Sequence, residues 1–296
     1  LNGEGAYQGY TLFPPLRSTT TYLVDMNGEV VHEWESEHSP GNAAYLFDDG
    51  SMMRCARVQN PVFSGGGQGG RIQELQWDGT VTWDFAFSDE TKLHHHDIEP
   101  LPNGNLLLIA WERMTAEEAI AAGRDPAQVG ESGLWPDFLI EVEPIRPDGG
   151  RVVWEWHVKD HLIQDFDREK AGYGDVTAHP GRVDINLDHR SEPPMSEAER
   201  KRQEELEKEM RALGYLGGDD DEEEDRPEGR GRQRRGGDWM HSNSVDYSAE
   251  HDLIALSVHN FHEVWIIDHS TTTEEARGNR VGRWGRGGEI LYRWGN

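Results

Sequence analysis

The chain has 296 residues, a formal net charge of -27 and a mean hydropathy of -0.81. This acidic balance leaves no basic face for phosphates, so nucleic acid is excluded as an expected partner. No apolar run reaches the length of a membrane span. The single cysteine, Cys55, excludes an internal disulfide, and we interpret it as a small core residue rather than a nucleophile.

Two short phrases alternate along the chain. A Gly turn, an apolar run and a Trp make up the first, which occurs at residues 25–34, 76–85, 146–156 and 285–294. The second has two apolar runs around a turn and occurs at residues 43–54, 97–110 and 244–257. Alternating apolar residues between Asn-Gly, Asp-Gly and Gly-Gly turns indicate strands and hairpins. Repetition at a period of about 50 residues predicts an all-β propeller with blades of about four strands.

In chain order, the first repeat unit is predicted over residues 19–60 and the second over residues 70–113. A capping box at Thr115 and a stop at Gly123 predict a short helix after the second unit. The third unit begins at Asp137 and is interrupted, and the fourth reaches the end of the chain. These are only about three and a half units, so we expect a further polypeptide segment to complete the propeller. A homo-oligomer is left open.

The interruption spans about residues 191–237 of what is otherwise one propeller domain over residues 1–296. Its first part, Ser196–Leu213, has a capping box and an apolar stripe, which predict a helix outside the blades. An acidic block and a Gly/Arg tract follow. Neither can bury enough apolar surface to fold, so we expect a disordered loop there.

Histidines occupy matching places in the second phrase. Aligning the apolar residues places His96 opposite Asn243 and His94 opposite His241. Residues two apart on a strand share a face, so we expect these four side chains to point toward a central channel. His95 and Asp97 are then expected on the opposite face.

Other histidines are interpreted by their place on the strands. His259 follows the strand after His241 and is expected to return to the channel, whereas His251, His262 and His269 are expected at the surface. Three readings stay open for the channel residues: polar turn residues, a metal site of His94, His96 and His241 in a lyase-like enzyme, or a site of group transfer. The Trp residues are interpreted as packing between blades.

Three segments together resemble the bacterial arylsulfotransferase family, the type that uses no nucleotide sulfate donor. They are GYTLFPPLRSTTTYLVDMNGEVVHEW, HHHDIEPLPNGNLLLIAWE and DWMHSNSVDYSAEHDLIALSVHNFHEVWIID. The resemblance implies a six-bladed propeller in the periplasm or at the cell surface. It also implies transfer of a sulfuryl group from a phenolic sulfate to a phenol through a sulfated histidine, with no cofactor and no metal.

Carried over by position, the resemblance assigns catalytic roles to His96, His241, Asn243 and His259, and substrate binding to His94. His259 stands where the family has an arginine, and a neutral imidazole holds a sulfate less firmly than a guanidinium does. The family's nucleophilic histidine belongs to a later blade, beyond Asn296. A non-catalytic surface or assembly module on the same fold is the further alternative.

Overall fold

The computed structural model describes residues 3, 5–187, 201–202, 205–206 and 237–295. Residues 1–187 and 236–296 form one compact unit, and residues 188–235 form a second. The predicted disordered tract lies outside the described residues. So does most of the predicted helix Ser196–Leu213, of which only residues 201–202 and 205–206 are described, as helical.

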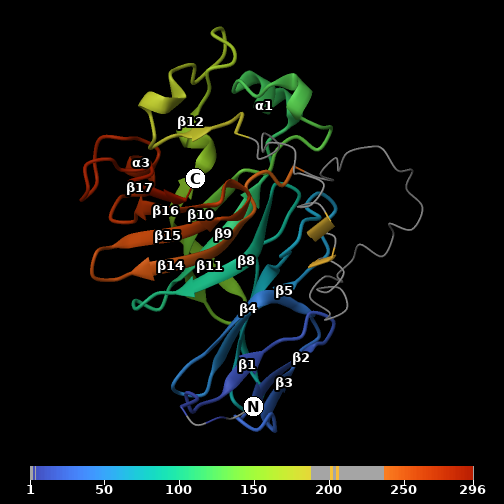
Figure 1. Cartoon of the computed structure of the whole chain (residues 1–296). Helices are drawn as coiled ribbons and strands as arrows, with labels where there is room; N and C mark the ends of the chain where they lie inside the picture. The colour runs from blue at the N-terminus through green and yellow to red at the C-terminus, as the bar shows by residue number, and fades with distance from the viewer. Residues whose placement is uncertain (1–2, 4, 188–200, 203–204, 207–236, 296) are drawn as a thin grey trace. The chain divides into compact units, whose positions relative to one another are not determined.

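Four antiparallel sheets follow one another along the larger unit (Figure 1). The first has three strands, β1 (Thr11–Phe13), β2 (Thr20–Val24) and β3 (Val30–Glu35). The second has β4 (Pro40–Leu46), β5 (Met52–Arg57), β6 (Gly70–Leu75) and β7 (Val81–Ala86). The third has β8 (Lys92–Pro100), β9 (Leu106–Glu112), β10 (Asp137–Ile145) and β11 (Gly149–His157). The fourth has β14 (Ser242–Ser248), β15 (Leu253–Val258), β16 (Glu263–Asp268) and β17 (Tyr292–Gly295).

Each of these sheets is a meander, with strands hydrogen-bonded in sequence order. The predicted all-β, propeller-like class is therefore confirmed. A parallel pair, β12 (Leu162–Ile163) and β13 (Val183–Asp184), lies between the third and fourth sheets in sequence. The short helices are α1 (Ala116–Ala121), η1 (Pro126–Gln128), η2 (Val158–His161), η3 (Val176–Ala178), η6 (His259–Phe261) and α3 (Thr273–Ala276).

Helix α1 begins as its sequence predicts. The Thr115 hydroxyl accepts a hydrogen bond from the Glu118 amide, and the Glu118 carboxylate accepts one from the Thr115 amide. Gly123 follows the helix with φ of 96°, a conformation that glycine adopts without steric cost. No helix in the described part of the chain is long and apolar enough to cross a membrane.

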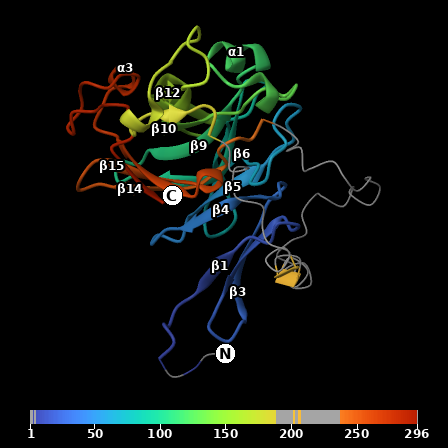
Figure 2. The ribbon, with the colours of Figure 1, turned by 45° about the horizontal axis from the view of Figure 1, so that its top comes forward.

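The sheets are out of phase with the predicted repeat units. The second phrase at residues 43–54 falls in β4 and β5. The first phrase that follows, at residues 76–85, supplies the turn after β6 and the strand β7 of the same sheet. A repeat looks the same whichever phrase is taken as its start, so the sequence pattern does not reveal at which phrase each sheet begins. The first strand of each four-stranded sheet therefore carries the start of the second phrase. We call β4, β8 and β14 the inner strands, since β8 contacts both others (Figures 1 and 2).

Apolar side chains fill the spaces between neighbouring sheets. Trp34 and Met52 belong to the cluster between the first two sheets, and Trp83 to the cluster between the second and third. Trp156 and Trp265 belong to the cluster that joins the third and fourth. The Trp residues of these clusters thus pack between sheets, as the sequence predicted. Cys55 is fully buried in the second cluster.

Three tryptophans also link each sheet to the next by a hydrogen bond. The Trp34 indole N–H donates to the Gln76 carbonyl at 3.1 Å, and that of Trp83 donates to the Gly149 carbonyl at 2.8 Å. Trp156 donates in the same way to Gly288. Each acceptor lies in or beside the turn before the outermost strand of the following sheet. Trp294, on the outermost strand of the fourth sheet, is 69% exposed.

His269 joins the third and fourth sheets, and the expectation that it lies at the surface is wrong. Its Nδ1 lies 2.7 Å from Asp252 Oδ1, and its Nε2 lies 3.0 Å from Glu141 Oε2. Burial by itself lowers the pKa of His269, but the two carboxylates outweigh it and raise that pKa. For Glu141, burial is outweighed by hydrogen bonds from His269, Asn105 and Asn103, which lower its pKa to about 2.

The contribution of His269 to the stability of the larger unit should therefore fall as pH rises. A histidine with a raised folded pKa contributes its full stability below about pH 6.5, its unfolded value, and loses it as pH rises through the folded pKa. In urea unfolding, the free energy of unfolding should fall less steeply above about pH 6.5 in His269→Gln than in the parent. The exposed His251→Gln is the matched control and should keep the parent slope. An identical slope in His269→Gln would contradict the assignment.

Candidate active site

The inner strand β8 departs from regular strand geometry at its histidines. His94 pairs with Ala110 and Ile98 pairs with Leu108, so the residues between them form a bulge. His96 has φ of 57°, a left-handed conformation that is uncommon for a histidine. The bulge breaks the period of two and brings Nδ1 of His95 to 2.8 Å from Nδ1 of His96. The prediction that His95 faces away from His96 is wrong.

His95 is held between an aromatic ring and a carboxylate. Its ring stacks on Trp111 with centroids 4.0 Å apart, and its Nε2 lies 3.2 Å from Asp137 Oδ1. The other carboxylate oxygen of Asp137 accepts a hydrogen bond from the Ser242 amide at 2.9 Å. Burial lowers the pKa of His95 to about 3 and raises that of Asp137 to about 7. The contact between His95 and Asp137 is therefore a hydrogen bond of a neutral imidazole, not an ion pair.

His241 brings the fourth sheet to the same place. Its ring centroid lies 4.5 Å from that of His96 and 5.4 Å from that of His259. Its Nδ1 hydrogen-bonds Asp238 Oδ2, and its φ is 53°. Uncommon backbone conformations at two touching histidines are typical of functional sites. His95, His96, His241 and His259 thus form a row that runs from fully buried to exposed. We call it the histidine row.

Two of the predicted site residues lie differently. Nδ1 of His94 accepts a hydrogen bond from the Gly70 amide, and its Nε2 lies 3.3 Å from the Asp97 carbonyl and 3.5 Å from Cys55 Sγ. Asn243 is exposed and forms the bulge of β14 between Ser242 and Ser244. The structure therefore brings together His96, His241 and His259. The catalytic and binding roles of all five predicted site residues stay predictions.

A glycine-rich segment, residues 64–70, packs against these rings and was not recognised from the sequence. A Cβ at Gly67 would lie 2.1 Å from His96 Nε2, and one at Gly69 would lie 2.5 Å from His94 Nδ1. A Cβ at Gly65 would lie 2.7 Å from the Trp111 ring. The His96 amide donates to the Gly67 carbonyl at 2.7 Å. The run SGGGQGG is the signal that could have revealed it, since close backbone approach requires glycine.

Substituting Gly67 with alanine should destabilise the larger unit and disturb His96. The new Cβ would overlap Nε2 of His96, and φ of 71° is strained for any L residue. We expect a loss of more than about 1 kcal/mol in the free energy of unfolding. Gly79→Ala is the matched control, because Gly79 also has positive φ but no atom within 4 Å of its Cβ position. Equal losses in both variants would mean that contact with His96 adds nothing.

Unsatisfied polar atoms gather around the histidine row. Within the described residues, Nε1 of Trp111, Nε1 of Trp135 and Oδ1 of Asp238 are buried and have no hydrogen-bond partner. The Trp111 and Trp135 rings lie 5.6 Å apart, and Asp238 lies three residues before His241 in sequence. Buried polar atoms normally have a partner. These are therefore the atoms that a bound polar molecule or water would satisfy.

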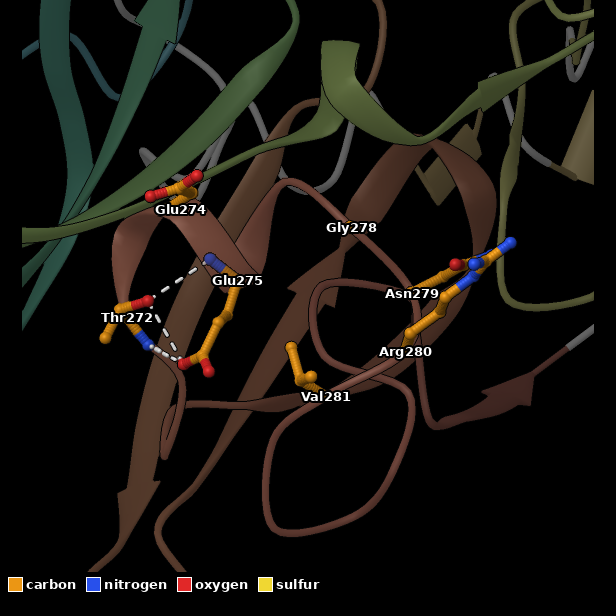
Figure 3. Close-up of a pocket in the computed structure, with 7 residues that line it drawn as sticks. All are labelled: Thr272, Glu274, Glu275, Gly278, Asn279, Arg280 and Val281. Atoms are coloured by element: carbon orange, nitrogen blue, oxygen red, sulfur yellow. Dashed lines mark hydrogen bonds between the residues drawn. The ribbon is translucent and has the colours of Figure 1, made fainter.

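A surface pocket lies elsewhere, beside α3 (Figure 3). It is lined by Thr272, Glu274, Glu275, Gly278, Asn279, Arg280 and Val281. The dashed lines in Figure 3 show Glu275 and Thr272 bonded to each other as the capping box of α3, so these groups serve the helix. None of the lining residues is a predicted site residue. Among the described residues, no three His, Cys, Asp or Glu side chains are grouped to hold a metal ion.

The fold and the histidine row define a propeller-like β protein with a candidate site on its inner strands. The family model described as Arylsulfotransferase (ASST) matches residues 15–274. The chain therefore belongs to the arylsulfotransferase family, as its resemblance predicted.

No curated protein matches the chain. Among solved structures, Kuenenia stuttgartiensis hydrazine synthase is similar with a TM-score of 0.46 and 10% identity, over 97% of this chain and 59% of that one. A protein of unknown function from Bacteroides caccae has a TM-score of 0.35 and 8% identity, over 98% of this chain and 73% of that one. This chain thus spans about three fifths of the first neighbour, and likenesses this weak carry no argument about function.

Proposed function

We propose that this chain carries a sulfuryl-transfer site, in which a sulfuryl group passes from an aryl sulfate to a phenol through a histidine. The observation that carries the proposal is the contact of His96 and His241. Their rings lie 4.5 Å apart on neighbouring sheets of a chain that belongs to the arylsulfotransferase family. Imidazole is both a competent nucleophile and a proton carrier near neutral pH.

The first half of the reaction loads the nucleophilic histidine, which the family resemblance assigns to a later blade. The aryl O–S bond breaks as an imidazole nitrogen bonds to sulfur. His241, whose Nδ1 is held by Asp238, gives a proton to the departing phenolate. Asn243 and His259, both exposed at the outer end of the row, are proposed to donate hydrogen bonds to the sulfuryl oxygens.

The second half returns the histidine to its starting state. The acceptor phenol passes its proton by way of His96: burial lowers the pKa of this ring to about 2, so it is neutral at rest and gives the proton up at once. The phenol oxygen bonds to sulfur as the S–N bond breaks. The proton then moves from His96 to the neighbouring His241, and atoms and charge balance over the cycle.

The proposal extends to the setting of the site. Trp294 is exposed on the outermost strand, where the equivalent strands of earlier sheets donate to the next sheet. We propose that a further polypeptide segment, supplied by a longer form of this protein or by a second copy, packs there and completes the propeller. We also propose that the complete protein acts in the periplasm or at the cell surface, where aryl sulfates from outside the cell are available.

The test is incubation of the complete protein with an aryl sulfate and an acceptor phenol, with no nucleotide sulfate present. Appearance of the sulfated acceptor supports the proposal. Absence of transfer with a stoichiometric metal content would favour the metal-dependent enzyme instead. Absence of both would favour a non-catalytic module, for which His259 in the place of the family's arginine is the supporting observation.

A further inference from the structure

The structure assigns to Asp137 and His95 a positioning role: together they hold the proton of His96 on Nδ1 and leave Nε2 as its basic nitrogen. This inference deepens the proposed function, since a base or nucleophile at His96 needs an unprotonated Nε2. Neither Asp137 nor His95 was among the residues predicted from the sequence or from the resemblance. We call the three side chains the proton relay.

The direction of the proton relay follows from its hydrogen bonds. The Asp137 carboxylate only accepts, so the nitrogen beside it, Nε2 of His95, carries a proton. His95 is fully buried and neutral, so its Nδ1 is unprotonated and accepts. The nitrogen that meets it at 2.8 Å, Nδ1 of His96, must therefore donate. Because His96 is neutral as well, its Nε2 has the lone pair.

The surroundings hold the proton relay in one geometry. Trp111 stacks on the His95 ring at 4.0 Å, and the Ser242 amide fixes the second oxygen of Asp137. The His96 amide donates to Gly67, which fixes the backbone of the bulge. Asp137 comes from β10, the histidines from β8, and Ser242 from β14, so the relay joins the third and fourth sheets beside His241. A carboxylate that orients an imidazole in this way sets which of its nitrogens reacts.

Protonating Asp137 would reverse the relay. A protonated carboxyl donates to Nε2 of His95, the His95 proton moves to Nδ1, and the His96 proton moves to Nε2. The charged and titratable groups that act on the relay are His241 and Asp238, from the segment before β14, together with His94 on β8 and His259 in η6. Burial raises the pKa of Asp137 to about 7, so the two directions exchange near neutral pH. The direction that leaves Nε2 of His96 unprotonated, as the proposed reaction needs, is the one present above that pH.

The inference is tested by nitrogen NMR of protein labelled with ¹⁵N-histidine, which reports the protonated nitrogen of each ring. At about pH 8.5, above the Asp137 pKa, we expect His96 to be protonated on Nδ1 and His95 on Nε2. Signals are assigned from the spectrum of His96→Gln. In Asp137→Asn the amide N–H donates where the carboxylate accepted. The proton of each ring should therefore move to the other nitrogen of the same ring. A proton on Nε2 of His96 in the parent, or an unchanged pattern in Asp137→Asn, would overturn the inference.

Two further measurements keep this test decisive. If Asp137→Asn does not fold, lowering the parent from about pH 8.5 to 6 should produce the same exchange by protonating Asp137, and no exchange would overturn the inference. Asp268→Asn is the matched control. Asp268 is also fully buried, but its carboxylate accepts hydrogen bonds from two amides and a hydroxyl in the segment between β16 and β17, so its loss should leave both rings unchanged.

Activity then separates the inference from the proposed function. In an active enzyme, Asp137→Asn should lower kcat by about 10²- to 10⁴-fold with little change in KM, because the wrong nitrogen is protonated. The activity of the parent should decrease as the pH is lowered through about 7, because Asp137 becomes protonated there. Should the parent transfer no sulfuryl group while His96 shows the expected protonation, the proposed function fails and the positioning role stands.

Discussion

Replacing His96 by alanine is expected to slow sulfuryl transfer by about 10²- to 10⁴-fold, the range for loss of a positioned proton acceptor. His241→Ala should cost about a hundredfold or more, since it removes the group that faces the leaving phenolate. The His96 ring, on β8, and the His241 ring, directly before β14, lie 4.5 Å apart, so the two losses should not add in the double variant. The measurement is the steady-state rate with an aryl sulfate and a phenol.

The control for these variants is His179→Ala, an exposed histidine of the segment before β13. It should keep the parent rate. Asn243→Ala separates two versions of the site: a large loss would show that the exposed amide turns toward the sulfuryl group in the working enzyme. A parent rate in both His96→Ala and His241→Ala would exclude the histidine row as the reactive centre.

Truncating Trp83 is expected to have the largest effect on stability. Its ring is fully buried between the second and third sheets, and its N–H donates to Gly149 at 2.8 Å. Trp83→Ala should lower the free energy of unfolding by about 3–5 kcal/mol, the usual cost of removing a buried Trp. Denaturant unfolding of the larger unit gives the value directly.

Trp294→Ala is the matched comparison on the fourth sheet. With a ring 69% exposed, it should change the stability of this chain by no more than about 0.5 kcal/mol. In a form that includes the proposed further segment, the same substitution should become costly, because that segment would cover the ring. A large loss for Trp294→Ala in this chain alone would contradict the structure of the fourth sheet.

Local signals in the sequence predicted much of the fold. The capping box at Thr115 depends on residues three apart, and the Gly turns depend on single positions, so neighbouring residues suffice to recognise them. The Trp residues were recognised as packing because they recur with the turns. The residues at which each sheet begins and ends were not predicted. Hydrogen bonding between β5 and β6 joins the second phrase to the segment before the next first phrase, and the repeat pattern alone does not show this pairing.

The candidate site was less accessible from sequence. Repeat alignment placed His96 and His241 near one another, and the structure shows their rings in contact. It missed His95, because a bulge depends on the register with β9 rather than on the run of histidines. It also missed Asp137, which lies 42 residues further along the chain and reaches His95 only through the pairing of β8, β9 and β10.

The tryptophan links between sheets make the larger unit behave as a short one-dimensional array. Each sheet is stabilised by its own hydrogen bonds and by its interfaces with its immediate neighbours, so the total is a sum over adjacent pairs. The second and third sheets each have two such interfaces, whereas the fourth has the third as its partner. Opening should therefore spread inward from the outer sheets, and amide protons of β9 and β10 should be the last to exchange with solvent. The proton relay, anchored on β8 and β10, occupies the part of the array that opens least often.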